Sequence, residues 1–190
     1  MSKRVLLIKL TSMGDLMHAL PALTDARRMV PNITFDWVVD EAFSEVPSWH
    51  PAVENIIPSA HRRWKKNLKQ SVFGGQLKNF YTRLNAENYD IILDAQNNLK
   101  SAVIAGLRRG QCHGLDKFSI REKPAHWAYR YRHPADKSLH AIARQRQLFA
   151  QAIGYQVPQS APDYGIDRSR LHLPDIDLPN RYLVFVHNAS

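Results

Sequence analysis

The feature that most constrains the fold is the apolar run Val5–Ile8, which contains no polar residue. A strand without alternation is typical of the centre of a parallel sheet, where both faces are buried. A short loop, Thr11–Asp15, follows, and apolar residues then recur at helical spacing from Leu16 to Ala26. This order of strand, loop and helix predicts an α/β unit whose first loop lies at the carboxyl edge of the sheet.

Further segments alternate between strand and helix patterns along the chain. Pro21 lies inside the first helical pattern, where it should kink the helix or mark its true start. Residues 117–137 are irregular, basic and aromatic, and we expect a long surface loop there. The alternation predicts an α/β fold with a Rossmann-like parallel sheet flanked by helices. Beyond residues 5–8, strands are predicted at 34–39, 55–58, 89–94 and 182–186, and helices at 16–26, 72–84, 101–108 and 139–153.

Prolines near the end of the chain indicate a linker-like stretch before the last predicted strand. We therefore expect one domain over residues 1–155 and a linker over residues 156–180. Residues 181–190 would then be the first strand of a second domain that is cut short. No signal-peptide pattern is present, and no apolar run approaches the ~20 residues of a membrane-spanning helix, so a cytoplasmic protein is expected. Cys112 is the only cysteine, which excludes an intramolecular disulfide.

The net charge of +9 favours anionic partners. Most of the positive charge lies in residues 55–146, which hold 18 Lys and Arg against 6 Asp and Glu. Residues 55–86 contain seven basic residues and no acidic residue. Such a run is either an ordinary solvated face or a surface that binds nucleic acid, a phosphorylated substrate or an acidic membrane. Binding to nucleic acid is disfavoured, because no helix-turn-helix, zinc or RNP-like motif accompanies the charge.

The loop Thr11–Asp15 has the composition of a helix start that can face an anion. Helix N-termini present unpaired N–H groups and a partial positive charge. Thr11 or Ser12 can cap the helix, and Gly14 lets a substrate approach the backbone. Asp15 either takes a proton from a substrate hydroxyl or merely stabilises the helix end. A nicotinamide enzyme is disfavoured, because the Gly-x-Gly-x-x-Gly fingerprint is absent.

A second loop, beginning at Ala95, is expected at the same edge of the sheet. Ligands of such sheets bind at the carboxyl ends of the strands, so both loops are candidates for the site. Gln96 should point into the same cleft as Asp15. Its amide can bind a sugar hydroxyl, although an ordinary loop amide is the alternative. The histidines show no convincing metal-ligand spacing, and we propose no metal and no cofactor.

The segment Lys9–Leu23, KLTSMGDLMHALPAL, closely resembles the start of the bacterial ADP-heptose:lipopolysaccharide heptosyltransferases (glycosyltransferase family 9), of the heptosyltransferase I type. The resemblance covers nearly the whole chain. It implies a two-domain GT-B fold, in which the amino-terminal domain binds the acceptor and the carboxy-terminal domain binds ADP-heptose. The implied reaction is an inverting, metal-independent transfer of heptose to the Kdo of the lipopolysaccharide inner core. The resemblance continues through Phe35–Val39, Pro47–His50, Arg62–Lys66, Asp94–Gln96, Lys100–Ser101, His113–Gly114, Arg121–Glu122 and His140.

The resemblance also implies roles for individual residues. Asp15 would be the general base that deprotonates the acceptor hydroxyl. The basic residues would pair with the Kdo carboxylate and the lipid A phosphates. Trp64 either packs on a sugar or lipid or belongs to the core. Asn97 departs from the family, since relatives commonly have glycine after Asp-Ala-Gln, and could re-angle its loop. The implied acceptor-binding residues are Ser12, Met13, Gly14, Arg62, Arg63, Lys65, Lys66, Gln96, Lys100, Arg121 and His140.

The implied partners are a Kdo–lipid A acceptor, ADP-heptose and the anionic inner face of the bacterial inner membrane, to which the enzyme would be peripheral. ADP-heptose would bind through a carboxy-terminal domain that this chain lacks, so the chain alone is expected to be inactive. Two alternatives stay open. One is a related enzyme that acts on a heptose acceptor, and the other is a basic nucleic-acid-binding module.

Overall fold

The computed structural model describes residues 2–66, 74–108, 110–172, 177 and 179–183. The strands of this part are β1 (Lys3–Ile8), β2 (Ile33–Asp40), β3 (Val53–Ser59), β4 (Ile91–Asp94), β5 (Cys112–Leu115) and β6 (Tyr131–His133). Its α-helices are α1 (Met13–Met17), α2 (Leu20–Met29), α3 (Glu45–Ser48), α4 (His61–Lys66), α6 (Gln76–Leu84), α7 (Leu99–Gly106) and α8 (Ala141–Ile153). Short 3₁₀ helices are η1 (Glu41–Phe43), η2 (Lys123–Ala128) and η3 (Arg168–Arg170).

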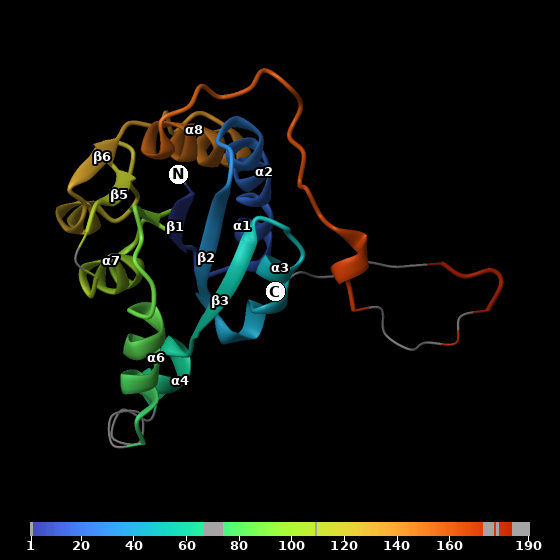
Figure 1. Cartoon of the computed structure of the whole chain (residues 1–190), viewed down its shortest axis with the longest axis horizontal. Coiled ribbons are helices and arrows are strands. Elements are labelled where there is room, and N and C mark those ends of the chain that lie inside the picture. Colours follow the sequence, from blue (N-terminus) through green and yellow to red (C-terminus); the bar gives the residue numbers. More distant parts are fainter. Residues whose placement is uncertain (1, 67–73, 109, 173–176, 178, 184–190) are drawn as a thin grey trace.

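The strands form one parallel sheet in the order β3-β2-β1-β4-β5-β6 (Figure 1). This is the strand order of a Rossmann fold. Residues Val5–Ile8 of β1 are completely buried, as the apolar run predicts for a central strand. The predicted Rossmann-like parallel sheet flanked by helices is therefore confirmed.

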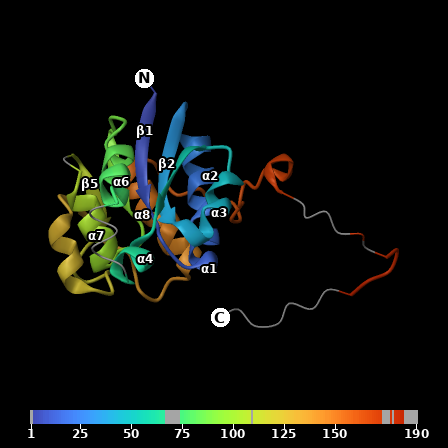
Figure 2. The same cartoon turned by 90° about the horizontal axis from the view of Figure 1, so that it is seen from below.

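Helices cover both faces of the sheet. Helices α2 and α8 pack against each other on one face, while α7 packs on β1 and β4 and α6 on β3. Figures 1 and 2 show α6 and α7 on the opposite side of the sheet from α2. This doubly wound arrangement leaves the carboxyl edge of the sheet open to the loops that follow β1 and β4.

The first predicted helix is two helices, α1 and α2. Pro21 lies in the first turn of α2, where a missing N–H costs no intrahelical hydrogen bond. It therefore marks the true start of a helix, which is one of the two outcomes that the sequence allows. The break leaves α1 with five residues, and Ser12 is its N-cap.

Two strands were not predicted, and the expectation of an irregular loop over residues 117–137 is wrong in part. That stretch contains η2 and the edge strand β6, where Tyr131 and Arg132 are exposed. An edge strand needs no apolar run, and β5 is only four residues long and includes His113 and Gly114. Neither therefore carries a strong strand pattern. Residues 72–73 of a predicted helix and 184–186 of the last predicted strand lie outside the described residues.

The chain after α8 runs along α2 and α3. The guanidinium of Arg146 binds both carboxylate oxygens of the buried Asp25, and donates to the carbonyls of Pro158 and Ser160 at 3.0 and 3.1 Å. Farther on, Gly165 has φ +60° and no room for a Cβ against Thr24 and His50. The first part of the stretch predicted as a linker thus contacts the domain, while the proposed domain division stays a prediction. Among the described residues, every helix is too short or too polar to span a bilayer.

Candidate active site

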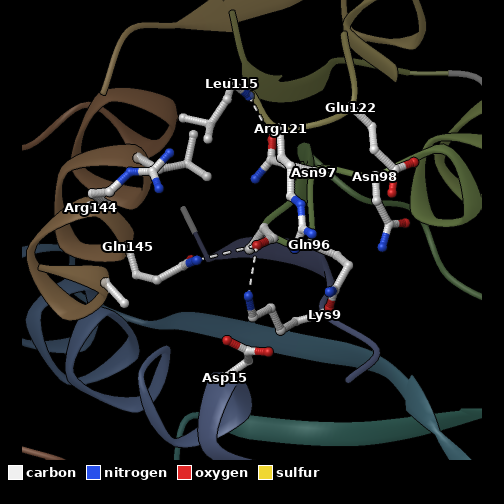
Figure 3. Close-up of a pocket in the computed structure, with 13 residues that line it drawn as sticks. Lys9, Asp15, Gln96, Asn97, Asn98, Leu115, Arg121, Glu122, Arg144 and Gln145 are labelled. Carbon is white, nitrogen blue, oxygen red and sulfur yellow. Dashed lines mark hydrogen bonds between the residues drawn. The ribbon is translucent and has the colours of Figure 1, made fainter. Parts of the chain in front are cut away.

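A polar cavity of about 270 Å³ opens at the carboxyl edge of the sheet (Figure 3). It lies between the loops after β1 and β4, the two neighbouring strands whose onward connections run to opposite faces of the sheet. In doubly wound sheets this switch point is where ligands bind. Helix α8 closes the cavity on one side. The lining residues are Lys9, Asp15, Ala95, Gln96, Asn97, Asn98, Leu115, Arg121, Glu122, Ala141, Arg144, Gln145 and Leu148.

Asp15 lies in the first turn of α1, and its side chain is exposed to the cavity. Its Oδ2 accepts hydrogen bonds from the N–H of Ser12 at 3.0 Å and from the Ser12 hydroxyl at 3.3 Å. Its other oxygen, Oδ1, has no hydrogen-bond partner within the described part of the chain. The two roles considered for Asp15 are thus compatible, because one oxygen holds the helix end and the other can accept a proton.

Lys9 is the buried cation of the cavity floor, and sequence reasoning missed it. Its Nζ donates to the carbonyl of Ala95 at 3.1 Å, and Figure 3 shows Asp15 facing it. Burial lowers the pKa of Lys9, while the negative charges of Asp15 and Asp94 raise it. The available signal was a lysine directly after a fully buried strand, since a lysine is almost never buried without a partner.

Gln96 fastens the two loops to each other. Its Oε1 accepts from the N–H groups of Leu10 and Thr11, at 2.9 and 3.2 Å. The amide oxygen is therefore used within the protein, as the loop-amide interpretation predicts. A substrate hydroxyl can be met only by the amide nitrogen. Gln96 consequently places the loop that carries Asp15.

The loop after β4 is built around the fully buried carboxylate of Asp94. This carboxylate accepts from the N–H groups of Gln96 and Asn97, at 3.0 and 2.8 Å, and from the hydroxyl of Tyr129 at 2.7 Å. Burial raises the pKa of Asp94, and these hydrogen bonds oppose the shift. Tyr129 is held in turn against Gly114, where a Cβ would come within 2.4 Å of the ring.

The backbone of Asn97 accounts for an asparagine at a position where the resemblance leads us to expect glycine. Its φ is +57°, in the left-handed region that glycine adopts freely and that asparagine tolerates best among other residues. Its Oδ1 also accepts from the N–H of Leu115 at 2.8 Å. The asparagine therefore keeps the backbone turn and ties the loop to β5.

Helix α8 contributes two polar side chains that the sequence analysis did not single out. The Nη2 of Arg144 donates to the carbonyl of Ser119 at 2.9 Å, and Gln145 donates to the carbonyl of Ala95 at 3.2 Å. Arg144 Nε and Gln145 Oε1 are buried and lack a partner among the described residues. Together with Lys9 and Arg121, Arg144 makes the cavity a good site for an anionic group.

The predicted basic cluster of α4 does not line this cavity. Arg63 forms a bidentate pair with Glu41, at 3.1 and 2.8 Å, and Arg62 Nε lies 3.6 Å from a carboxylate oxygen of Asp40. The stretch that contains no acid in sequence is thus partly neutralised by Asp40, the last residue of β2, and Glu41, the first residue of η1. Lys66 is exposed, and the side chain of Lys65 lies outside the described residues.

The remaining predicted residues lie around the cavity or away from it. His140 is the N-cap of α8, and its ring meets the edge of His18 near the end of α1. Trp64 packs edge-on against Phe80, with 5.2 Å between ring centroids, which favours the core interpretation. The structure thus brings Asp15, Gln96 and Arg121 together at the cavity. Ser12, Met13 and Gly14 lie beside them in α1 and its cap. Lys100 and the α4 residues instead line or border another surface. Within the described part of the chain, no His, Cys, Asp and Glu side chains gather as metal ligands would.

Comparisons with known proteins give consistent matches. Residues 77–190 match the model of glycosyltransferase family 9 (heptosyltransferase). Over 188 residues the chain is 49% identical to lipopolysaccharide heptosyltransferase 1 of Pseudomonas aeruginosa and 45% identical to that of Escherichia coli K12. These alignments cover 98% of this chain but 52% and 59% of the relatives, so the chain spans about half the length of the curated relatives it matches.

Solved structures give the same result. The E. coli heptosyltransferase WaaC with ADP superposes with a TM-score of 0.83 and 47% identity, over 85% of this chain and 51% of that one. The E. coli ADP-heptose lps heptosyltransferase II superposes with a TM-score of 0.63 over 87% of this chain and 47% of that one. At 17% identity, this second match shows the fold alone.

Proposed function

Because the chain belongs to glycosyltransferase family 9 (heptosyltransferase), we propose that it is the acceptor-binding half of an enzyme that transfers heptose from ADP-heptose to the Kdo of the lipopolysaccharide inner core. The observation that carries the proposal is the 49% identity to a lipopolysaccharide heptosyltransferase 1 across nearly the whole chain. The polar cavity, with a carboxylate facing a cationic floor and wall, supports it. ADP-heptose would bind a second Rossmann-like domain, which completes a GT-B enzyme.

Asp15 would act as the general base. As the acceptor hydroxyl attacks the anomeric carbon of heptose, its proton passes to Oδ1 of Asp15, the new C–O bond forms and ADP leaves with the electrons of the broken bond. A single displacement inverts the anomeric centre and needs one base. The N–H of Ser12 at the start of α1 donates to Oδ2 of Asp15, which leaves Oδ1 to take the proton.

The acceptor anions would be divided between two groups of cations. Lys9, Arg121 and Arg144 line the cavity and suit the Kdo carboxylate. Arg62 and Lys66 are exposed on α4 and, with Lys65 and Lys100, suit the lipid A phosphates. Arg63 is less available because Glu41 already binds it bidentately.

We place the enzyme in the cytoplasm, peripheral to the inner face of the inner membrane. The basic stretch of residues 55–146 supports this location, since each cation near an anionic leaflet contributes roughly 1 kcal/mol of attraction. The ion pairs of Arg62 and Arg63 reduce the number of cations that count.

The test uses a full-length enzyme made by joining this chain to the second half of the P. aeruginosa relative. Heptose transfer from ADP-heptose to Kdo–lipid A is measured for the parent, for Asp15→Asn and for Asp136→Asn, a matched change of an exposed aspartate outside the cavity. Asparagine can still accept the Ser12 N–H bond, so the helix end survives. We expect kcat to fall about 10²- to 10⁴-fold for Asp15→Asn only. Unchanged turnover would remove Asp15 from the role of base.

The acceptor is tested on the same parent enzyme. Kdo–lipid A should be used, and a heptosylated core should not. The reverse preference would show the related enzyme that acts on a heptose acceptor. A steep, salt-dependent affinity for generic DNA, without affinity for the acceptor lipid, would favour the nucleic-acid module instead.

A further inference from the structure

A second hollow lies on the face of the sheet opposite α2 and α8, between α4, α6 and α7. Figure 1 shows these three helices gathered at one side of the molecule. We call it the apolar groove. Its volume is about 520 Å³, and its lining is almost entirely hydrophobic. The lining residues are Leu10, His61, Trp64, Leu77, Phe80, Tyr81, Lys100, Val103, Ile104 and Leu107.

The groove continues onto an exposed apolar stripe of α7. Leu99, Val103 and Leu107 recur one turn apart and are 48%, 66% and 43% exposed. Tyr81 of α6 borders them and is half exposed. Single exposed apolar residues are common, but a contiguous set along a hollow marks a surface that something apolar covers.

The lining of the groove contains a lysine and no acidic residue, and the exposed charged residues beside it on α4 are basic. Lys100 lines it, and His61 at its wall is followed in α4 by Arg62 and Lys66, both exposed. The acidic side chains in contact with this surface are Asp40, which lies 3.6 Å from both His61 and Arg62, and Glu122, which accepts from the N–H of Leu99 at 3.0 Å. An apolar hollow with a cationic rim complements a molecule that has a hydrocarbon chain and an anionic head, rather than a neutral apolar peptide.

The groove also begins next to the candidate active site. Leu10 lines the groove, whereas the preceding residue, Lys9, lines the polar cavity. Successive residues of an extended chain point to opposite faces. The side chains of Lys9 and Leu10 therefore line two different hollows, one on each side of the sheet. The loop Thr11–Asp15 follows immediately and lies at the edge between the two hollows. A molecule with a sugar at Asp15 can therefore reach the groove around this edge.

We propose that the apolar groove binds one acyl chain of the anionic glycolipid acceptor, with Lys100 and Arg62 beside its phosphate. The identity of the glycolipid rests on the proposed function, while the binding of an acyl chain does not. Bound in this way, the acyl chain is withdrawn from the bilayer, and the sugar end of the acceptor is held at a fixed position relative to Asp15.

Binding is measured first on this chain alone, with Trp64 of the groove wall as the reporter. The probe is a lysophosphatidic acid with a dibromostearoyl chain, because bromine quenches tryptophan fluorescence only at close range. We expect quenching in the parent. Val103→Asp, at an exposed position that tolerates the change, should bind the brominated probe at least tenfold more weakly than the parent. Met29→Asp, at an exposed methionine on α2, should bind it as tightly as the parent.

Three results would overturn the proposal. These are equal affinity of the parent and Val103→Asp, undiminished quenching in Trp64→Phe, and quenching by brominated phosphatidylglycerol vesicles but not by the monomeric probe. The last would mean that the face lies flat on a bilayer instead of taking up a chain. Circular dichroism of each variant checks that the fold is retained.

The second measurement uses the joined full-length enzyme with acylated and fully deacylated acceptors. Val103→Asp should raise KM at least tenfold for the acylated acceptor and leave both kinetic constants unchanged for the deacylated one. An equal effect on both acceptors would refute the acyl-chain role. If the parent transfers heptose to neither, the proposed function and the assignment to the acceptor fail together, and the fluorescence result separately decides whether the groove takes an acyl chain.

Discussion

The buried ion pair between Arg146 of α8 and Asp25 of α2 offers the sharpest test of the fold. Arg146 is 7% exposed and Asp25 2% exposed, and two N–H groups of the guanidinium, on Nε and Nη2, meet the two carboxylate oxygens at 2.5 and 3.2 Å. The same guanidinium donates to the carbonyls of Pro158 and Ser160. One side chain thus joins two helices and the segment that follows α8.

The expected magnitude follows from what each substitution leaves behind. Arg146→Met removes the cation and leaves Asp25 buried without its partner, which costs about 3–5 kcal/mol of unfolding free energy. Asp25→Leu strands the arginine and should cost a similar amount. The double variant buries no unpaired charge and loses only the carbonyl contacts, so it should be destabilised by about 1–2 kcal/mol. The cycle therefore predicts strong coupling, with the double variant more stable than either single one.

Urea unfolding of the four proteins, followed by far-ultraviolet circular dichroism, gives the cycle directly. Limited proteolysis adds an independent measurement, because all three variants should be cut faster at residues 158–172 than the parent. Single variants within about 1 kcal/mol of the parent, or additive losses in the double variant, would refute the argument, since they would mean that the pair is hydrated.

Three further predictions concern other buried contacts. Burial, with the nearby cations, lowers the pKa of His50 to about 4, so the unfolding free energy should fall by up to about 3 kcal/mol as pH falls from 6.5 to 4. The unfolding free energy of His50→Gln should change less over this range, and a pH profile equal to that of the parent would contradict the shift. Asn97→Gly should cost about 1–3 kcal/mol through the unpaired N–H of Leu115, and Asn97→Ala about 1 kcal/mol more because of its positive φ, as urea midpoints will show. Gly114→Ala should lower stability by about 1–3 kcal/mol, because its Cβ meets the ring of Tyr129, and a thermal midpoint equal to that of the parent would disprove the close packing.

The central part of the fold could be predicted because its signals are local. The apolar run of β1, the helical spacing after it and the position of Pro21 each depend on neighbouring residues. Strand β6 could not be predicted in this way. It is three residues long, mostly exposed, and exists because β5 offers it an edge. Its pairing with β5 depends on residues distant in the sequence, and its own composition does not indicate a strand.

The same distinction applies to the candidate site. Asp15 and Gln96 could be placed because each follows a recognisable buried strand, whose carboxyl ends meet at one edge. Arg144 lies on a helix whose composition does not reveal which side faces the cavity. The pairing of Arg63 could not be predicted for a different reason, since its acidic partner Glu41 is twenty-two positions away in the chain. Charge counted along a sequence cannot show pairing across elements.

The link made by Gln96 also has an evolutionary consequence. The loop that carries Asp15 is positioned by the side-chain amide of Gln96, which lies in the loop after the neighbouring strand β4, 86 and 85 positions after the residues that it binds. A substitution in either loop is therefore judged by selection in the context of the other, and their effects on turnover should be epistatic. A homologue that exchanges the first loop without the second would keep the carboxylate but place it on a backbone with a different orientation. The two loops are best regarded as one heritable unit, separated in the gene and joined in the fold.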